Sequence, residues 1–453
     1  MHANIPNKLN TKKSRMKQID LLLTAAWIIT VNENNDVLEK QSIAINNGVI
    51  VDILPTKVAL QQYQANTHHT LLDHAITPGL INSHTHAAMN LFRGLADDLP
   101  LMEWLQSHIW PAEQAHTNQS FVRTGSTLAI AEMLRSGTTC FNDMYFFADE
   151  TAKVASEMGI RACLGLIVID FPTVWANDAE EYISKGIQLH DQLRNNALLT
   201  TAFAPHAPYT VSDAPLQKIL TLSEELDIPV HMHIHETEDE VNMAIDTTTM
   251  RPLQRLAKLG ALTPKLISVH MTQLNDEEIE NIAAQGSHVV HCPESNQKLA
   301  SGLCPVQNLI DAGVNVALGT DGAASNNDLD MLGEMRSAAL LGKITNMDAQ
   351  AVNAKTALRM ATINGAKALG IDDITGSLEI GKAADIIAID LNTIETQPVY
   401  DPISQIVYAA GREQVTDVWV AGKQKLADSK LTCLDEKELL NEVKKWQQQI
   451  SAT

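Results

Sequence analysis

One stretch decides the fold of this chain: Ile76-Thr-Pro-Gly-Leu-Ile-Asn-Ser-His-Thr-His86. A Pro-Gly turn signal stands near its start, an apolar run follows, and two histidines one residue apart, His84 and His86, close it. In an extended strand, residues i and i+2 point to the same side, so both imidazoles share a face. Such a pair is half of a metal site, although the same pattern also occurs on polar loops. Later segments of the chain must decide between these interpretations.

Short apolar stretches recur after this one, and longer helical segments separate them. Together with Ala75–Ser83, the predicted strands are Thr138–Asp143, Ala162–Ile169, Leu199–Ala204, Pro229–His235, Leu266–His270, Ser287–His291 and Asn315–Thr320. Strands that alternate with helices in this way are typical of an α/β fold with a parallel sheet. We therefore predict a (β/α)8 TIM barrel over residues 76–370 that carries the catalytic site.

Segments with an all-β pattern flank the predicted barrel. Residues 17–75 and 376–430 contain short apolar strands broken by turns, and each segment is too short to hold a core alone. We expect them to pack together as one small β-sandwich domain, with the barrel inserted between its halves. A flexible tail is expected over residues 1–16 and a C-terminal helix over residues 435–450.

The first apolar segment, Leu21–Val31, follows several basic residues and resembles the start of a signal peptide. Asp20 interrupts the junction, and no small-residue cleavage site follows. Residues 32–36 are typical of a hairpin turn, which favours a first β-strand. Eleven residues are also too few to span a bilayer.

The composition excludes several classes of partner. The chain has 453 residues, of which 45% are apolar and 19% charged, as in a soluble globular protein. Its net charge of −21 argues against nucleic acid or an anionic membrane as partner. Five scattered cysteines without a C-x-x-C motif argue against a disulfide framework and fit a reducing cytosol, so we expect a cytoplasmic protein.

The predicted strand ends carry an ordered series of metal-ligand and acid-type side chains. In a TIM barrel, function collects at the C-terminal ends of the strands. Those ends carry His84, His86, His206, His233, Glu236, His270, His291 and Asp321. Two or three histidines with one aspartate suit Zn²⁺, and Fe²⁺ or Mn²⁺ less well. Such a site lowers the pKa of bound water to ~7 and makes it a nucleophile.

The sequence pattern does not decide the role of every one of these residues. His231, His233 and His235 share one face by alternation, so periodicity cannot choose the ligand among them. Asp321 ends an apolar strand, where it is costly to bury unless it is paired or liganded, and its alternative role is a helix N-cap. His291 fits a buried strand end as well as a position near the metal.

In combination, these motifs resemble the amidohydrolase superfamily, in its branch of triazine hydrolases and nucleoside deaminases. The motifs are Pro78-Gly-Leu-Ile-Asn-Ser-His-Thr-His86, His233-x-x-Glu236, Ser268-Val-His270, His291-Cys-Pro-Glu-Ser-Asn296 with Lys298-Leu-Ala-Ser-Gly302, and Gly319-Thr-Asp-Gly322. Within that branch, residues 89–105 and Trp110-Pro-Ala-Glu113 are similar to the deaminases of 5′-methylthioadenosine and S-adenosylhomocysteine. The resemblance covers about residues 17–430.

The resemblance implies a role for each site residue. His84, His86, His233 and Asp321 would hold the metal. Glu236 would shuttle protons, Asp321 would accept one from the attacking water, and His270 would lie beside that water. Glu113 would hold the ribose hydroxyls, His206 would contact the nucleoside, and Trp104 would pack against the substrate. Members with two metals carry a lysine at the end of the fourth strand, and residues 199–206 contain none, which implies one divalent metal per subunit, most readily Zn²⁺.

The implied reaction is hydrolytic deamination of an adenine nucleoside to the 6-oxo purine nucleoside and ammonia, with 5′-methylthioadenosine, adenosine and S-adenosylhomocysteine as the candidate substrates. Relatives that accept S-adenosylhomocysteine are expected to bind its carboxylate through arginines after the third strand, yet residues 164–177 contain no arginine. We therefore predict a preference for 5′-methylthioadenosine or adenosine. The partner would be this small molecule, with no nucleic acid and no membrane, and the resemblance allows a homo-oligomer.

The sequence leaves two alternative functions open. The same metal set would serve a deaminase or chlorohydrolase of another heteroaromatic ring, such as guanine, a pterin or a triazine, and Glu113 discriminates that case through ribose recognition. A scaffold without catalytic activity that binds purines or partners is the other alternative, and its metal content would expose it.

Overall fold

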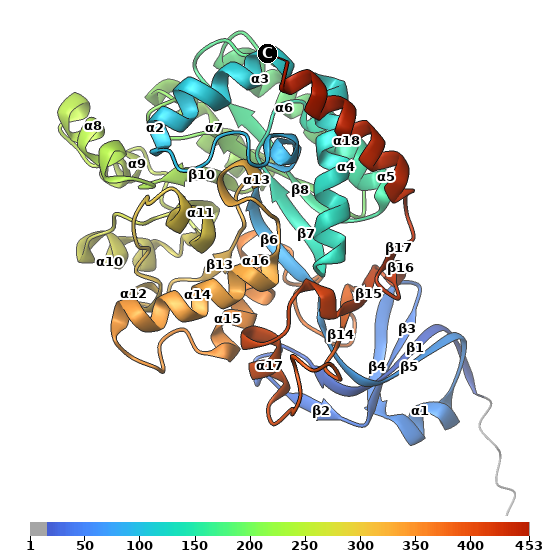
Figure 1. The fold of residues 1–453 in the computed structure, drawn as a ribbon. Helices are drawn as coiled ribbons and strands as arrows, with labels where there is room; N and C mark the ends of the chain where they lie inside the picture. The colour runs from blue at the N-terminus through green and yellow to red at the C-terminus, as the bar shows by residue number, and fades with distance from the viewer. Residues whose placement is uncertain (1–15, 453) are drawn as a thin grey trace, which may run out of the picture.

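Two sheets organise the molecule, one in a barrel and one in a smaller unit beside it (Figure 1). The computed structural model describes residues 16–452, so the tail predicted over residues 1–16 lies outside the described residues except for Met16. Within residues 16–452, no helix is both long enough and apolar enough to cross a membrane.

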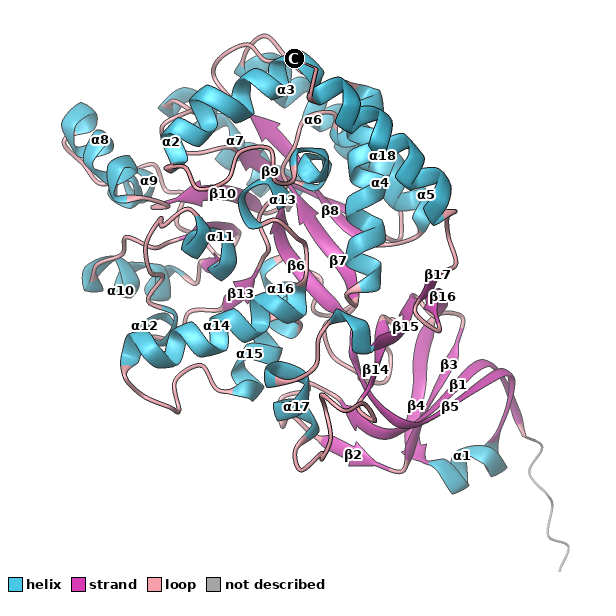
Figure 2. Ribbon diagram, in the orientation of Figure 1, coloured by secondary structure: helices cyan, strands magenta, loops and turns pink. Residues whose placement is uncertain are grey.

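The barrel sheet consists of eight parallel strands in sequence order (Figure 2). They are β6 (Leu80–Thr85), β7 (Thr138–Asp143), β8 (Arg161–Val168), β9 (Leu199–Pro205), β10 (Val230–Ile234), β11 (Leu266–His270), β12 (His288–His291) and β13 (Val316–Leu318). The backbone N–H of Asp321 donates to the carbonyl of His84 over 3.0 Å, so the tips of the last and first strands meet. The predicted fold class, a TIM barrel with a separate β unit, is confirmed.

Helices surround the barrel strands, and several of them begin at a side-chain N-cap. They are α4 (Gln119–Arg135), α5 (Ala148–Met158), α6 (Ala179–Leu193), α7 (Asp213–Leu226), α8 (Glu238–Thr248), α9 (Pro252–Lys258), α10 (Asp276–Gln285), α11 (Pro293–Lys298), α12 (Val306–Asp311), α13 (Ala323–Asn326), α14 (Met331–Asn346), α15 (Ala354–Met360) and α16 (Ile363–Ala368). The side chains of Asn118, Asp178 and Asn275 accept first-turn N–H groups of α4, α6 and α10. These caps satisfy donors that a helix start would otherwise leave unpaired.

The second sheet combines the two ends of the chain. Its strands are β1 (Lys17–Ile29), β2 (Val37–Glu39), β3 (Gln41–Asn46), β4 (Val49–Pro55), β5 (Tyr63–Pro78), β14 (Ile386–Asp390), β15 (Val415–Val420), β16 (Lys423–Ala427) and β17 (Lys430–Leu431). The order β17-β16-β15-β14-β5-β1-β3-β4 joins the C-terminal strands to the N-terminal strands through β5. A bridge between Val49 and Ala383 shows that the sheet bends back on itself, around a core that includes Ile43, Ile386 and Trp419.

Three helices accompany this sheet and the chain end: α1 (Thr56–Gln62), α17 (Pro402–Tyr408) and α18 (Glu436–Ile450). The last helix lies along α4 (Figure 1), where the Trp446 and Phe121 rings meet edge to face at 5.4 Å. The first predicted strand lies within β1, which pairs with both β3 and β5 and is therefore internal to its sheet.

The strand predicted over Ala75–Ser83 is divided at Gly79, because β5 ends there in one sheet and β6 begins in the other. Pro78 pairs with Ile386 of β14, whereas Leu80 pairs with Thr138 of β7. A Cβ atom at Gly79 would lie 2.0 Å from the Thr139 hydroxyl, so only glycine lets the backbone pass this point. The close approach of the Thr139 side chain to the Gly79 backbone fixes the junction, which the apolar run alone does not mark.

Candidate active site

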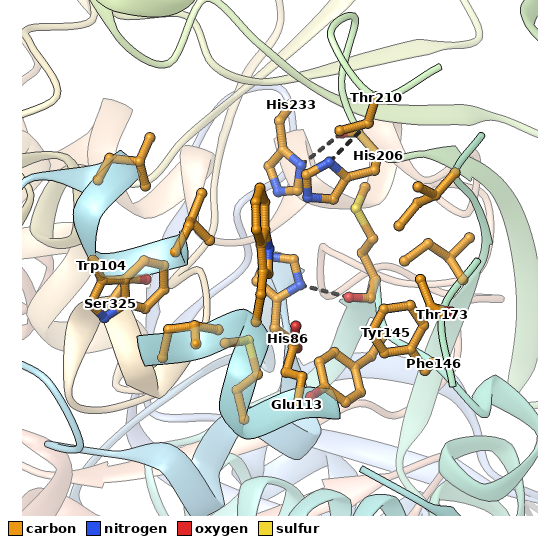
Figure 3. Close-up of a pocket in the computed structure, with 18 of the residues that line it drawn as sticks. His86, Trp104, Glu113, Tyr145, Phe146, Thr173, His206, Thr210, His233 and Ser325 are labelled. Atoms are coloured by element: carbon orange, nitrogen blue, oxygen red, sulfur yellow. Dashed lines mark hydrogen bonds between the residues drawn. The ribbon is translucent and has the colours of Figure 1, made fainter. Parts of the chain in front are cut away.

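A cavity of about 480 Å³ opens at the C-terminal ends of the barrel strands. Eight of the nine predicted site residues line it: His86, Trp104, Glu113, His206, His233, Glu236, His270 and Asp321. The ninth, His84, is fully buried beneath the cavity floor. Figure 3 shows His206 and His233 at one end of the pocket and Glu113 with Tyr145 at the other, with His86 between them.

Four side chains on the cavity floor direct their donor atoms at one another. Asp321 Oδ1 lies 3.3 Å from His84 Nε2 and 3.2 Å from His86 Nε2. His233 Nε2 lies 3.2 Å from His84 Nε2. His84, His233 and His270 form a second group with converging ligand atoms. Three imidazole nitrogens and one carboxylate oxygen this close together fit a divalent cation of the zinc type.

Hydrogen bonds on the far side of each ring prepare the Nε2 atoms for this role. His86 Nδ1 donates to the carbonyl oxygen of Met144 over 2.6 Å, and His233 Nδ1 donates to that of His206 over 2.8 Å. A neutral ring that donates from Nδ1 has its lone pair on Nε2, which is the arrangement found at metal sites. The hydroxyl of Ser295 donates to Asp321 Oδ2 over 2.7 Å and leaves Oδ1 toward the histidines.

The histidines of the cavity floor differ in the direction of their pKa shifts. Burial lowers the pKa of His84 to about 4 and the pKa of His233 well below its ordinary value, so both rings are neutral at neutral pH. Burial acts the same way on His86, but the hydrogen bond and charge of Asp321 outweigh it and raise the pKa of His86 to about 9. Those two rings hold the pKa of Asp321 well below its ordinary value although burial opposes this. A cation must therefore displace one proton, from His86.

The structure places the three histidines of β10 and its end in different surroundings. His233 reaches the cavity, while His231 lies one step deeper, with its Nε2 atom 2.9 Å from His84 Nδ1. His235 has left the strand with a φ of 54° and accepts the backbone N–H of Leu253. Strand alternation therefore stops before His235. Asp321 is not a helix cap, because Gly322 occupies the N-cap of α13.

Glu236 and His270 lie side by side at the edge of the floor, with Oε2 and Nε2 3.8 Å apart. Burial raises the pKa of Glu236 above its ordinary value, since the charged carboxylate is poorly solvated there. A carboxyl group with a raised pKa is able to carry a proton near neutral pH. His270 Nδ1 lies 2.9 Å from Asn296 Oδ1, which orients the ring.

The opposite end of the cavity comes from the segment between β6 and α4. This segment contains a 3-10 helix (Ala87–Phe92), α2 (Leu101–Trp104), a π-helical turn (Leu105–Ile109) and α3 (Trp110–His116). Glu113 hydrogen-bonds with Tyr145, and desolvation raises its pKa to about 7 despite that bond. Trp104 is buried against the same cavity. The walls are otherwise largely apolar, and no arginine or lysine lines the cavity within the described chain.

Several residues that support the floor were not among the site residues predicted from the sequence. Ser295 and Asn296 stand within a quoted motif, but only the structure pairs them with Asp321 and His270. Asp143 ends β7 and accepts the backbone N–H of Ala87 over 2.7 Å, next to His86. Its position at a strand end was the available signal. His291 is buried and does not line the cavity.

The chain is similar to known proteins over most of its length. The amidohydrolase family matches residues 75–425. A 5-methylthioadenosine/S-adenosylhomocysteine deaminase from Teredinibacter turnerae is 49% identical over 434 residues, which is 96% of this chain and 98% of that protein. A solved structure of an adenosine deaminase from Xanthomonas campestris with bound zinc is 50% identical, has a TM-score of 0.96, and covers 97% of this chain and 100% of its own.

A more distantly related structure has the same fold. An atrazine chlorohydrolase from Arthrobacter aurescens complexed with zinc is 22% identical, with a TM-score of 0.87 over 94% of this chain and 99% of its own. At that identity the likeness supports the fold alone. The matches at 49% and 50% identity cover 96% and 97% of this chain. This chain belongs to the amidohydrolase family.

Proposed function

We propose that this protein catalyses the hydrolytic deamination of an adenine nucleoside, 5′-methylthioadenosine or adenosine, with one Zn²⁺ per subunit. One observation carries the proposal: a single cavity has the His84–His86–His233–Asp321 cluster in and beneath its floor at one end and Glu113 at the other. The names of the relatives at 49% and 50% identity, both deaminases of adenine nucleosides, point to the same reaction.

Each end of the cavity serves a different part of the substrate. The carboxyl group of Glu113 suits the pair of ribose hydroxyls, because a carboxylate accepts two hydrogen bonds. The purine ring would then reach the floor, with C6 over the histidine cluster and the ring nitrogen N1 toward Glu236. Trp104 and the apolar walls would cover the base and the 5′ substituent.

The residues of the chain divide the proton transfers between them. A bound Zn²⁺ supplies an acidic water as nucleophile. Asp321 would accept a proton from the attacking water, and Glu236 would deliver a proton to N1 so that negative charge does not build up on the ring. His270 stabilises the developing oxyanion. As the C6–N bond breaks, Asp321 would return its proton to the leaving amino group and Glu236 would take the hydroxyl proton, so the products are the 6-oxo purine nucleoside and ammonia.

The cavity lining also favours a substrate without a carboxylate. Its acidic groups are Glu113, Glu236 and Asp321, and no arginine or lysine faces them within the described chain. An anionic substituent would lose its hydration there without gaining a partner. S-adenosylhomocysteine should therefore have a lower kcat/KM than 5′-methylthioadenosine, and comparable values would rule this preference out.

The location and the assembly belong to the same proposal. Five free cysteines, four of them buried, fit the reducing cytoplasm. Closed homo-oligomers are the commonest assemblies among soluble enzymes, so we propose one here. Cell fractionation and light scattering would test these two points independently of the activity.

The decisive experiment is an ammonia-release assay on a substrate panel. Adenosine, 5′-methylthioadenosine, S-adenosylhomocysteine, guanine and cytosine would be compared on zinc-loaded and on chelated protein. We expect the zinc-loaded protein to deaminate adenosine and 5′-methylthioadenosine best, and the chelated protein to release no ammonia. Preferred turnover of guanine or cytosine, or activity that survives chelation, would refute the proposal. Unchanged activity in Glu113→Ala would reject ribose recognition and favour another heteroaromatic substrate.

A further inference from the structure

Glu236 stands on a turn that the backbone alone does not hold in place. β10 ends at Ile234, and the next residue, His235, has a left-handed φ of 54°. That conformation is unfavourable for a residue with a side chain and persists only where neighbours enforce it. The helix α8 begins only at Glu238, after the N-cap Thr237. The geometry of Glu236 must therefore come from contacts to its peptide groups.

The N–H side of this turn is held by Glu240. Its Oε1 accepts the backbone N–H of His235 over 3.0 Å, and its Oε2 accepts that of Glu236 over 2.7 Å. The side chain is buried, and within residues 16–452 its carboxylate contacts are these two backbone N–H groups. Two backbone donors are thus what this buried carboxyl group binds. Thr237 accepts the N–H of Glu240 and fixes the first turn of α8.

The carbonyl side of the turn is held by Thr272. Its hydroxyl donates to the carbonyl oxygen of Glu236 over 2.7 Å, and its backbone N–H donates to that of His235 over 3.0 Å. Thr272 stands two residues after His270, at the end of β11, and His270 itself has a φ of 74°. The contact therefore ties the turn that carries Glu236 to the strand end that carries His270.

We propose that Glu240 and Thr272 are positioning residues that set the 3.8 Å approach of the Glu236 carboxyl group to His270. Neither residue provides a metal-ligand atom or reacts with the substrate in this assignment. Together they hydrogen-bond to the N–H groups and the carbonyl groups of His235 and Glu236. The assignment rests on the proposed function, because it presumes that Glu236 transfers a proton.

Glu240→Gln and Thr272→Val are the variants that test it. The amide of Gln offers one acceptor where Glu offers two and points an NH2 group at a backbone N–H, whereas Val keeps the shape of Thr without its hydroxyl. A displacement of the acid by ~1 Å is expected to lower kcat by about 10-fold to 100-fold. KM should change little, because the ribose contact lies at the other end of the cavity.

Matched controls separate positioning from folding. Glu238→Gln changes an exposed acid in the same turn of α8, and Thr272→Ser keeps the hydroxyl, so both should retain the wild-type kcat. Zinc content and unfolding temperature are measured for every variant. A loss of kcat per bound zinc in E240Q and T272V, with T272S active, is the expected result.

Two outcomes would overturn the assignment. In the first, kcat per bound zinc stays at the wild-type value in E240Q and T272V, whether or not these proteins are less stable. In the second, T272S loses as much kcat as T272V, which would exclude the hydroxyl as the relevant group. Glu236→Gln is measured in parallel: if it keeps full activity, the proton-transfer role itself fails, whereas an inactive E236Q beside active E240Q and T272V refutes only the positioning.

Discussion

His84 Nδ1 and His231 Nε2 lie 2.9 Å apart in the closed interior of the barrel. Both rings are fully buried, and His84 presents its other nitrogen to Asp321 and His233. A ring that donates from Nδ1 to His231 keeps Nε2 unprotonated, so His231 sets the tautomer of a proposed ligand. His231 therefore supports the floor from below and does not take part in it.

This contact predicts that His231→Phe weakens zinc binding. Loss of such a partner lowers metal affinity by about 10-fold to 100-fold. His231→Gln places an amide oxygen near the position of Nε2 and should recover much of the affinity. Competition with a chromophoric chelator measures both constants. Wild-type affinity in H231F would show that His84 is oriented without this contact.

Zinc affinity should also rise with pH between 7 and 9. The pKa of His86 is raised to about 9 in the metal-free chain, so below that pH its proton must leave before the cation binds. One released proton corresponds to about a tenfold gain in affinity per pH unit, which levels off above about pH 9. Calorimetry in buffers with different ionisation enthalpies counts the proton directly. A pH-independent affinity with no proton release contradicts this expectation.

The affinity for the nucleoside should fall as the pH drops below 7. Desolvation raises the pKa of Glu113 to about 7, so the group binds a proton below that pH and ceases to be a doubly accepting carboxylate. KM for 5′-methylthioadenosine should then increase toward acid pH. In Glu113→Gln the KM should be higher than in the wild type and constant over the same range. A 2′,3′-dideoxy nucleoside should show little of this dependence, and an equal dependence for it would assign the effect to another group.

The pair Arg161–Asp385 should hold the two sheets together. Arg161 at the start of β8 donates from Nε to Asp385 Oδ2 over 2.8 Å and from Nη2 to Oδ1 over 3.2 Å, with both side chains buried. Removal of one partner from a buried pair costs about 3–5 kcal/mol. Arg161→Ala should lose this much free energy of unfolding in urea.

The exposed pair Arg194–Asp191 provides the control for that experiment. Arg194→Ala should change the free energy of unfolding by less than about 1 kcal/mol, because water screens the pair. If R161A is destabilised no more than R194A, the buried pair does not join the sheets.

The strand pattern of the barrel was predictable from local sequence. The eight predicted strands overlap β6 to β13, because each is a short apolar run that must be buried on both faces. The prediction was wrong in detail at Gly79, where one apolar run serves two sheets. That division depends on the close approach of Thr139, a residue 60 positions away, and no local pattern encodes it.

The residues that orient the side chains of the cavity floor could not be predicted from local sequence either. Ser295, Asn296 and Glu240 act through hydrogen bonds to Asp321, His270 and the Glu236 peptide, and polar residues of these types are common at helix starts. The partners of Ser295 and Asn296 follow other strands, so these contacts exist only once the barrel has closed, whereas Glu240 folds back onto the turn just before its own helix.

The sequence by itself determined the order of the strands and the shared face of His84 and His86. His84 and His86 had to share a face, because alternation is a property of any extended strand. Only the tertiary structure decided which histidine after β10 joins them. His231, His233 and His235 are equivalent by alternation, but the strand ends at Ile234 and the backbone turns left-handed at His235. Depth in the barrel then separates His231 from His233, and depth is set by the packing of eight strands around one axis.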